Sequence, residues 1–317
     1  MSNLAPANLE DLRASLAAAH ARRERIEAID LRAFDRVVDY EPEDMTATVE
    51  AGLTLAAFQE RLAQRGQWLP IDPPEPHAAT VGAILATNAS GPRRFGYGTI
   101  REHLLGLKVV LADGRLIRSG GRVVKNVAGY DLQKLFIGAR GTLGVIVEAT
   151  FKVRPLPAAE RFLAAPGLSF EEAAGLMKDV LDSPMAPVVL DLHRPAVPSY
   201  QPLLTLVLGF AGTPEEVEWQ ASKAIGLCDF RPTTLEYDER FWAEESAGPA
   251  RRLSVLPAQV AEAARALGAV DLLARAGNGV IYFRGGSPPP KGLQAQALAQ
   301  RLKDTFDPHH VFPELPS

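Results

Sequence analysis

The sequence predicts a mixed α+β protein that is divided into two units. Predicted strands and helices alternate along 317 residues, and 47% of these residues are hydrophobic, which is enough for a sizeable core. The first half is rich in glycine turns, whereas the second half repeats a regular pattern of strands and helices. Pro155 and Pro157 interrupt the chain between the two halves. We therefore expect units at residues 1–157 and 158–317.

Two segments of the first unit have the hydrophobic spacing of helices. Residues 8–28 begin with Asn8, a residue type favoured as N-cap, and apolar side chains recur at helical spacing through Leu12 and Leu16. Residues 53–66 ("LTLAAFQERLAQRG") have a second amphipathic pattern, which ends in glycine. We expect a helix over each segment.

The other segments of the first unit are mostly of the β type. "MTATVEAG" alternates between polar and apolar residues, and "LGVIVEATFKVRPLP" is an apolar run that stops at prolines. "HLLGLKVVLADGRLIRSG" contains two β-rich runs around Asp113-Gly114, which predicts a hairpin. "DLQKLFIGA" is expected to form a short helix.

The second unit has the pattern of a split βαβ fold. "ERFLAAPG", "PVVLDLHR" and "LLTLVLGFAG" are strand-like. The helix between the first two begins at Ser169 with Glu172 three residues on, a capping box, and the helix after the third has Pro214 in its first turn. This order of strand, helix, strand, strand, helix predicts a ferredoxin-like arrangement. Further strand and helix patterns follow to the end of the chain.

Bulk properties exclude several classes of function. The net charge of −4 argues against nucleic-acid binding, and no apolar run reaches the length of a transmembrane helix. The single cysteine, Cys228, excludes an internal disulfide and a cysteine-ligated iron–sulfur cluster within this chain. The histidines and carboxylates have no metal-site spacing. The N-terminus does not resemble a signal peptide, so we expect a cytoplasmic protein.

Four glycine-rich segments are the strongest functional signal. They are "TVGAILATNASG" (80–91), "FGYG" (95–98), "KNVAGYDL" (125–132) and "GARGTLGVI" (138–146). Each alone is explained by a tight turn. Because glycine has no Cβ, several such turns beside apolar strands also let backbone N–H groups approach a large flat ligand. Nucleophile-elbow, P-loop and zinc-protease motifs are absent from the sequence.

These segments, in this order, resemble the FAD-binding domain of the vanillyl-alcohol-oxidase-type flavoproteins, the PCMH-type family. The resemblance is strong over residues 37–155 and continues weakly to the C-terminal "LKDTFDPHHVFPELP". Within the family, "GRVVKNVAGYDLQKLFIGARGTLGVI" is most similar to the E subunits of bacterial glycolate oxidases, and somewhat less similar to the D subunits and D-lactate dehydrogenases. The resemblance implies a two-subdomain PCMH-type FAD-binding fold, followed by a ferredoxin-like α+β cap domain.

The resemblance also implies a set of residues that hold a non-covalent FAD, mainly through backbone groups. The matching positions are Pro74, Thr80, Val81, Gly82, Ala83, Asn88, Ser90, Gly91, Tyr97, Gly98, Gly141, Gly144, Val145 and Ile146. The family has a second glycine where this chain has Ala83, which costs little if the φ of this residue is negative.

A larger departure from the family lies upstream. Between its first helix and the "LDRV"-like segment the family has a strand and a glycine-rich turn, which supplies N–H groups to the FAD pyrophosphate. This chain reads "AAAHARRERIEAIDLRAFDRVV" there and has no glycine before Gly52. The N-terminal subdomain is therefore expected to be shortened, and FAD binding weakened, lost or completed by a partner subunit. We expect Arg22, Arg23 and Arg25 to form a solvated helix end.

The sequence does not identify a catalytic base. Hydroxy-acid oxidation needs a base for the hydroxyl proton and cations for the carboxylate. The cap segment "ARAGNGVIYFRGG" lacks the histidines that D-type relatives have there, and we expect surface or turn roles for His193, Arg194, Arg275 and Arg284.

The leading hypothesis is the FAD-binding subunit of a glycolate oxidase complex. It would be auxiliary to a catalytic D-type FAD subunit and an iron–sulfur subunit, in the cytoplasm or peripheral at the inner membrane through its partners, with glycolate or lactate as substrate of the complex. A self-sufficient FAD-dependent D-2-hydroxy-acid dehydrogenase is one alternative. A flavin-free scaffold subunit is the other, because the glycine-rich turn is missing.

Overall fold

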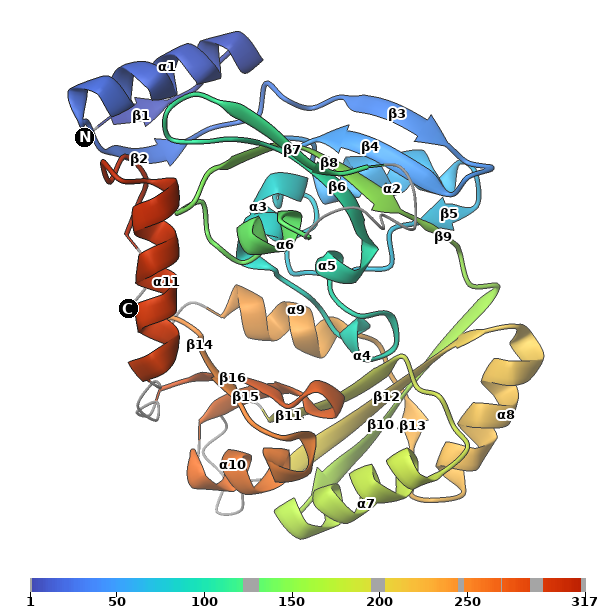
Figure 1. The fold of residues 1–317 in the computed structure, drawn as a ribbon. Helices are drawn as coiled ribbons and strands as arrows, with labels where there is room; N and C mark the ends of the chain where they lie inside the picture. The colour runs from blue at the N-terminus through green and yellow to red at the C-terminus, as the bar shows by residue number, and fades with distance from the viewer. Residues whose placement is uncertain are drawn as a thin grey trace.

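A computed structural model describes residues 2–121, 131–194, 203–244, 248–268, 270–285 and 293–314 of the chain, and it shows two α/β units packed against each other (Figure 1). The predicted turn "KNVAGYDL" lies mostly outside the described residues. The first unit contains β1 (Ser2–Leu4), α1 (Leu9–Arg22), β2 (Ile26–Ile29), β3 (Val37–Glu41), β4 (Thr46–Glu50), α2 (Leu55–Ala63), β5 (Gln67–Trp68), α3 (Val81–Thr87), α4 (Arg94–Tyr97), α5 (Ile100–His103), β6 (Leu104–Val110), β7 (Leu116–Gly120), α6 (Gln133–Phe136), β8 (Val145–Lys152) and β9 (Arg154–Pro155).

The first unit is built on a five-stranded antiparallel sheet with the order β3-β4-β8-β6-β7. Both faces of its middle strand β8 are covered. Ile146 packs in the core formed with α2 and α3, while Val145 and Val147 pack with Leu12 and Leu16 of α1 on the opposite side. The hairpin predicted around Asp113-Gly114 is confirmed by the pairing of β6 with β7.

The predicted helix over residues 8–28 is too long. Asn8 caps it as expected, but the helix ends at Arg22, and Arg23 takes a left-handed conformation with φ 52°. Residues Ile26–Ile29 form a strand instead, which pairs in parallel with β1. The backbone N–H of Ile26 also donates to the carbonyl of Val311 at 2.8 Å. Partners from both ends of the chain therefore decide the structure here, and helical spacing does not reveal them.

The second unit has the expected ferredoxin-like core. It contains β10 (Ala159–Leu168), α7 (Phe170–Asp182), β11 (Val189–Arg194), β12 (Leu204–Gly212), α8 (Pro214–Ile225), β13 (Arg231–Pro232), α9 (Glu236–Ala243), β14 (Arg251–Ser254), η1 (Pro257–Gln259), α10 (Val260–Ala266), β15 (Asp271–Arg275), η2 (Ala276–Asn278), β16 (Val280–Arg284) and α11 (Leu293–Phe306). The sheet order β13-β10-β12-β11 is that of a split βαβ fold, and β15, β16 and β14 extend the sheet. The capping box of Ser169 and Glu172 is present.

Small residues bring the two units into close contact at α4. The backbone N–H of Gly96 donates to the carbonyl of Val188 at 3.0 Å, and a Cβ at Gly96 would approach the Cα of Val188 to 2.6 Å. A Cβ at Gly277 would meet the ring of Phe95 at 2.3 Å. Side chains larger than hydrogen at these glycines would push the units apart.

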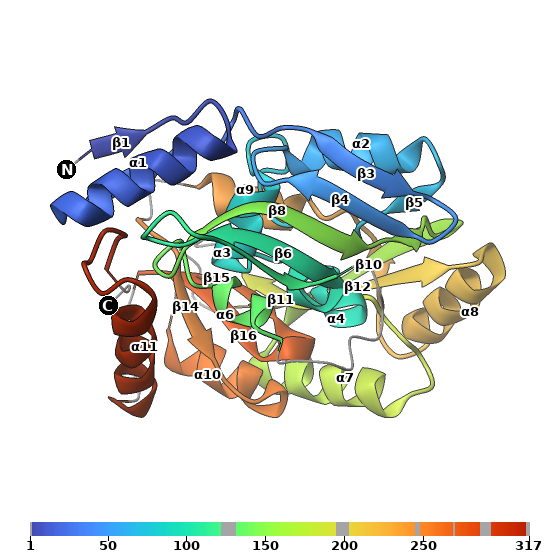
Figure 2. The same ribbon diagram turned by 45° about the horizontal axis from the view of Figure 1, so that its top comes forward.

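The C-terminal segment returns to the first unit. Figure 2 shows α11 and the residues after it beside α1. The ring of His309 stacks on the ring of His20 with centroids 4.1 Å apart, and Val311 and Phe312 are buried in the same core as Leu12. We propose the change of sheet near residue 157 as the boundary between the units, with this tail belonging spatially to the first one. Over the described residues, no helix has both the length and the apolar character needed to cross a membrane.

Candidate functional site

A cavity of about 340 Å³ opens in the first unit between β2, α3, the 140–146 turn and the C-terminal tail. Its lining residues are Ile26, Glu27, Ala28, Ile29, Asp30, Leu31, Arg32, Ala51, Thr80, Gly82, Ala83, Ala86, Phe136, Arg140, Gly141, Gly144, Val145, Ile146, Phe312 and Pro313. We call it the β2 cavity. Most of its wall is apolar, which suits a flat organic ligand with a few polar groups.

A second cavity of about 260 Å³ lies where the proline-rich segment, α3 and α9 of the second unit meet. It is lined by Pro73, Pro74, Glu75, Ala79, Ala83, Ile84, Thr87, Ala89 and Trp242, and we call it the α9 cavity. Ala83 lines both cavities, so the two are neighbours along α3, and we call the pair the α3 path. Such a path has the elongated form that a dinucleotide requires.

The structure brings eight of the fourteen predicted cofactor residues to these cavities. The β2 cavity contains Thr80, Gly82, Ala83, Gly141, Gly144, Val145 and Ile146, and the α9 cavity contains Pro74 and again Ala83. Ala83 belongs to helix α3 and is not among the residues with positive φ, so an alanine fits there as expected.

The six other predicted residues line neither cavity. Val81 is fully buried in the core, and Asn88 ends α3 with φ 52°. Ser90 accepts a hydrogen bond from Arg94 Nη1 at 3.3 Å, and Gly91 packs on the carbonyl of Asp72.

Tyr97 and Gly98 lie at the end of α4, where the two units meet. The ring of Tyr97 packs edge-on against Trp68 with centroids 5.2 Å apart, and Tyr97 also packs against the core residues Val188 and Val189 of the second unit. The "FGYG" segment therefore docks the units together in this structure.

The glycines that line the β2 cavity occupy their positions for different structural reasons. A Cβ at Gly144 would lie 2.7 Å from Val109 Cγ1, and one at Gly82 would lie 2.9 Å from the Cβ of Ala51. These two positions need glycine because the backbone packs closely on protein. Gly141 has φ 74°, and a Cβ there would meet no atom within 4 Å. Its backbone is open to the cavity and can approach a ligand.

Substitutions at Gly144 and at Gly141 separate the effect of packing from the effect of ligand contact. Gly144→Val is expected to lower the free energy of unfolding of the flavin-free protein by about 1–3 kcal/mol, because the added side chain overpacks the sheet. Gly141→Ala is expected to cost about 1–2 kcal/mol through its left-handed backbone, and to weaken FAD binding in addition. Urea unfolding and FAD titration of both variants measure these effects. Unchanged FAD affinity in a folded Gly141→Ala protein would contradict a ligand contact at this turn.

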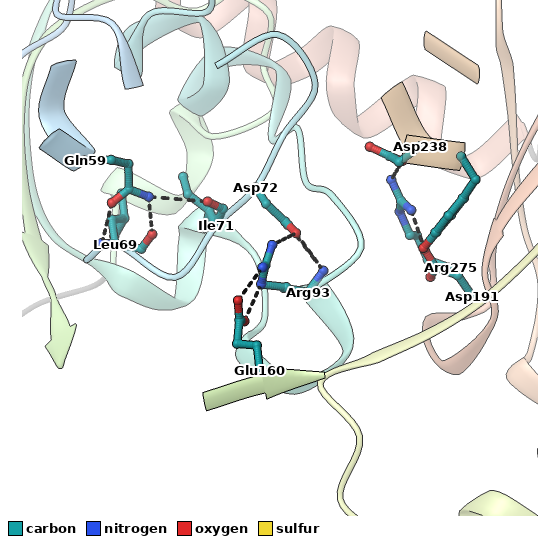
Figure 3. Close-up of polar contacts among 10 residues, drawn as sticks. Gln59, Leu69, Ile71, Asp72, Arg93, Glu160, Asp191, Asp238 and Arg275 are labelled. Atoms are coloured by element: carbon teal, nitrogen blue, oxygen red, sulfur yellow. Dashed lines mark hydrogen bonds and ion pairs between the residues drawn. The ribbon is translucent and has the colours of Figure 1, made fainter. Parts of the chain in front are cut away.

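Two ionic groups, one partly buried and one fully buried, flank the contact between the units, as Figure 3 shows. Arg93 donates to Asp72 Oδ2 at 3.1 Å and to Glu160 Oε2 at 2.7 Å, so it joins the proline-rich segment to β10. Burial raises the pKa of Asp72 to about 6, against the opposing effect of Arg93. Arg275 lies between Asp191 and Asp238 and is 1% exposed.

The expected surface or turn roles of three arginines are wrong. Arg194, Arg275 and Arg284 are all buried. Arg194 donates to the carbonyl of Val270, and Arg284 donates to the carbonyl of Phe241 at 2.9 Å. All three guanidinium groups therefore bind acceptors of the second unit itself, so that their positive charge is used in holding its structure.

His193 lies in strand β11, where its ring stacks on Tyr237 with centroids 4.6 Å apart. Burial, with a smaller contribution from Arg240, lowers the pKa of His193 to about 4. It is therefore neutral at pH 7, and it lines neither of the two cavities.

Four lining residues carry the charge of the β2 cavity: Glu27, Asp30, Arg32 and Arg140. Sequence reasoning did not select any of them. The spacing of Asp30 and Arg32 was a usable signal, because an Asp side chain often accepts from the backbone N–H two residues on. Arg22 and Arg23 are exposed at the end of α1, as expected, whereas Arg25 follows the helix and is half-buried; none of the three lines the cavity.

The residues present fit FAD over most of this path. Small side chains along α3 and the open backbone of Gly141 leave room for flat rings. The fit is poorest at the turn after β2. No glycine occurs there, and the backbone N–H of Arg32 already donates to Asp30 Oδ1 at 3.0 Å.

Sequence comparisons match part of this chain to an FAD-binding domain and to glycolate oxidase subunits. Residues 14–120 match the sequence family described as "FAD binding domain". The glycolate oxidase subunit GlcE of Escherichia coli is 38% identical over 148 residues, which are 46% of this chain and 42% of that protein. The glycolate oxidase subunit GlcD of Bacillus subtilis is 34% identical over 165 residues, 52% of this chain and 35% of that protein. The chain thus spans well under half the length of these relatives.

A D-lactate dehydrogenase and a solved structure extend the comparison. A probable mitochondrial D-lactate dehydrogenase of Danio rerio is 42% identical over 130 residues, 40% of this chain and 26% of that protein. The structure of an alkyldihydroxyacetonephosphate synthase matches 98% of this chain and 75% of its own with a TM-score of 0.74. At 18% identity, this likeness concerns the fold alone.

Proposed function

We propose a function from the premise that this chain carries a PCMH-type FAD-binding domain and is homologous, over about half its length, to glycolate oxidase subunits. The proposed function is that of an FAD-binding subunit in a complex that oxidises small 2-hydroxy acids such as glycolate. We further propose that it is auxiliary to a catalytic D-type subunit, with an iron–sulfur subunit as the route for electrons.

The observation that carries the proposal is the path formed by the β2 and α9 cavities. Two of the four glycine-rich segments, 80–91 and 138–146, line it, and its α9 cavity lies at the contact with the second unit. FAD supplies the oxidant for a hydroxy acid when it is bound. The chain's own residues would act as walls: α3 and Gly141 would exclude water from the ring faces, and Trp242 would close the end of the path.

The lining of the α9 cavity supports the auxiliary role. Among its described residues, Glu75 is the one ionisable side chain, and it carries a positive φ of 54°. A site that binds a hydroxy-acid carboxylate needs a cation, and none of these lining residues is basic. Arg275 cannot bind a substrate carboxylate without leaving Asp191 and Asp238 buried and without their cation. We therefore assign substrate turnover to a partner subunit.

The visible absorption spectrum of the purified chain tests the proposal. Flavin bands, present on purification or after incubation with FAD, and no bleaching by glycolate or D-lactate alone, are the expected results. Bleaching by substrate without partners would support a self-sufficient dehydrogenase instead. Co-expression with a D-type and an iron–sulfur subunit should give a complex in which the flavin is reduced by glycolate, and failure to co-purify would contradict the subunit role.

One observation favours a second candidate, the flavin-free scaffold. Asp30 and Arg32 satisfy each other in the turn where the family has its glycines, so this turn is closed without a ligand. The scaffold predicts a colourless chain that co-purifies with partners and shows no thermal shift with excess FAD. Saturable FAD binding by the isolated chain would exclude it.

A further inference from the structure

The turn after β2 holds a closed ion pair at the wall of the β2 cavity. Asp30 Oδ1 accepts from the backbone N–H of Arg32 at 3.0 Å, and Asp30 Oδ2 accepts from Arg32 Nε at 2.9 Å. The side-chain hydrogen bond from Arg32, then its backbone N–H, lowers the pKa of Asp30 to about 2. At neutral pH, a carboxylate therefore occupies the N–H group and the guanidinium that this turn could offer to an anion.

The same turn occurs elsewhere and is a local feature of the chain. Asp113 Oδ1 accepts from the backbone N–H of Arg115 at 3.0 Å, and Asp113 Oδ2 accepts from Arg115 Nε at 2.6 Å. This copy lies in the β6–β7 hairpin and does not line the β2 or the α9 cavity. What distinguishes Asp30 is its place in the β2 cavity.

Arg140 also lines the β2 cavity, but it differs from Arg32 because none of the described carboxylates pairs with it. Its φ is 51°, and its backbone N–H donates to the carbonyl of Ala86 at 2.7 Å, which fixes the turn to α3. Its side chain is exposed and makes no ion pair with any residue that the structure describes. With Glu27, Asp30, Arg32 and Arg140 ionised, the described residues that line this cavity have no net charge.

The diphosphate is the anionic part of FAD, and the cations lining its proposed path lie in the β2 cavity. We propose that the Asp30 carboxylate competes with this diphosphate for Arg32, so that Asp30 sets a weak, reversible affinity for FAD. Arg140, which forms no ion pair with the described residues, supplies the first charge-assisted contact. The inference rests on the proposed function only in taking FAD as the ligand.

The predicted effects are modest because the pair is exposed to solvent. Exposed ion pairs are weak and are screened by salt. Asp30→Asn keeps an oxygen that accepts the Arg32 N–H but removes the charge, and it should tighten FAD binding about three- to tenfold. Arg140→Gln removes a charge-assisted hydrogen bond to phosphate and should weaken binding by about tenfold.

The test is a titration of the flavin-free full chain with FAD, followed by flavin fluorescence and by calorimetry at low and high NaCl. Asp113→Asn is the matched control, since it changes an equivalent turn away from the cavity, and it should leave the affinity unchanged. The gain from Asp30→Asn should shrink at high salt. Asp30→Ser keeps an acceptor oxygen on a shorter, uncharged side chain. It is the second variant if the melting temperature of Asp30→Asn lies below that of the parent protein.

The outcomes separate the inference from the function. Equal or weaker FAD binding by both Asp30 variants, in a chain that does bind FAD, would overturn the role of Asp30 and leave the proposed function standing. If neither the parent nor any variant binds FAD, both the inference and the FAD-binding role fail. An equal gain from Asp113→Asn would mean that net charge, not the cavity pair, controls the affinity, and it would also overturn the inference.

Discussion

Replacing Arg275 with methionine is expected to lower the free energy of unfolding by about 3–5 kcal/mol, because it leaves two buried carboxylates without their cation. Arg275 Nη1 donates to Asp191 Oδ2 at 2.5 Å, and Nη2 donates to Asp238. Asp191 is 0% exposed, and the hydroxyl of Tyr237 also donates to it at 2.7 Å. Methionine keeps much of the volume, so that the charge is the main change.

The pH dependence of this loss follows from the pKa of Asp191. Burial raises this pKa to about 6 even with Arg275 opposing the effect, and removing the guanidinium would raise it further. An acid with a raised pKa in the folded state stabilises the fold at low pH, where it is protonated, and loses this contribution as pH rises through that pKa. The deficit of Arg275→Met should therefore be larger at pH 8 than at pH 5.

Urea unfolding at both pH values measures the loss. Arg231→Met is the matched control, since Arg231 pairs with Asp229 through side chains that are 70% and 73% exposed. Such an exposed pair is worth about 0–1 kcal/mol, so this variant should unfold almost like the parent protein. Similar losses for both variants, or a deficit that does not depend on pH, would contradict the account of the buried cluster.

Local structure was predictable where one residue type decides it. Ser169 and Glu172 form the capping box that their spacing predicts, and Gly114, with φ 81°, turns the hairpin. Residues 23–29 show the limit of this reasoning. Their hydrophobic spacing continues the preceding helix, but the strand forms because β1 and Val311 supply hydrogen-bond partners from the two ends of the chain. Tertiary pairing of this kind leaves no local pattern.

The candidate site was predictable only along its central segments. The glycines at 82, 141 and 144 mark walls of the β2 cavity, although at 82 and 144 the reason for glycine is packing. Asp30 and Phe312 reach the same cavity from distant parts of the chain. Arg275 looked exposed from its neighbours in sequence, because its partners Asp191 and Asp238 lie on other elements. Charges whose partners are remote cannot be assigned as buried from one sequence.

Lys303→Met is expected to lower the free energy of unfolding by about 3–5 kcal/mol and to weaken FAD binding by more than about tenfold. Lys303 is fully buried, and its Nζ donates to Asp307 Oδ2 at 2.6 Å and to the carbonyls of Thr142 and Phe312, each at 3.1 Å. It therefore ties the C-terminal tail to the 141–144 turn. Since Phe312 and this turn line the β2 cavity, loosening the tie should open the proposed FAD site.

Two variants separate the buried charge from other effects in urea unfolding and FAD titration. Lys178→Met removes an ion pair of the same spacing and the same 2.6 Å distance to Asp182, but with exposed side chains, and should change neither quantity appreciably. Asp307→Asn added to Lys303→Met removes the carboxylate charge that has lost its cation, but its amide NH2 would face the backbone N–H of Val311 or Phe312, both of which donate to Asp307, so it should recover only a small part of the stability. FAD affinity should recover less, because the bond to the Thr142 carbonyl is still missing. If stability falls in Lys303→Met while FAD affinity is retained, the tail supports the fold but does not shape the cavity.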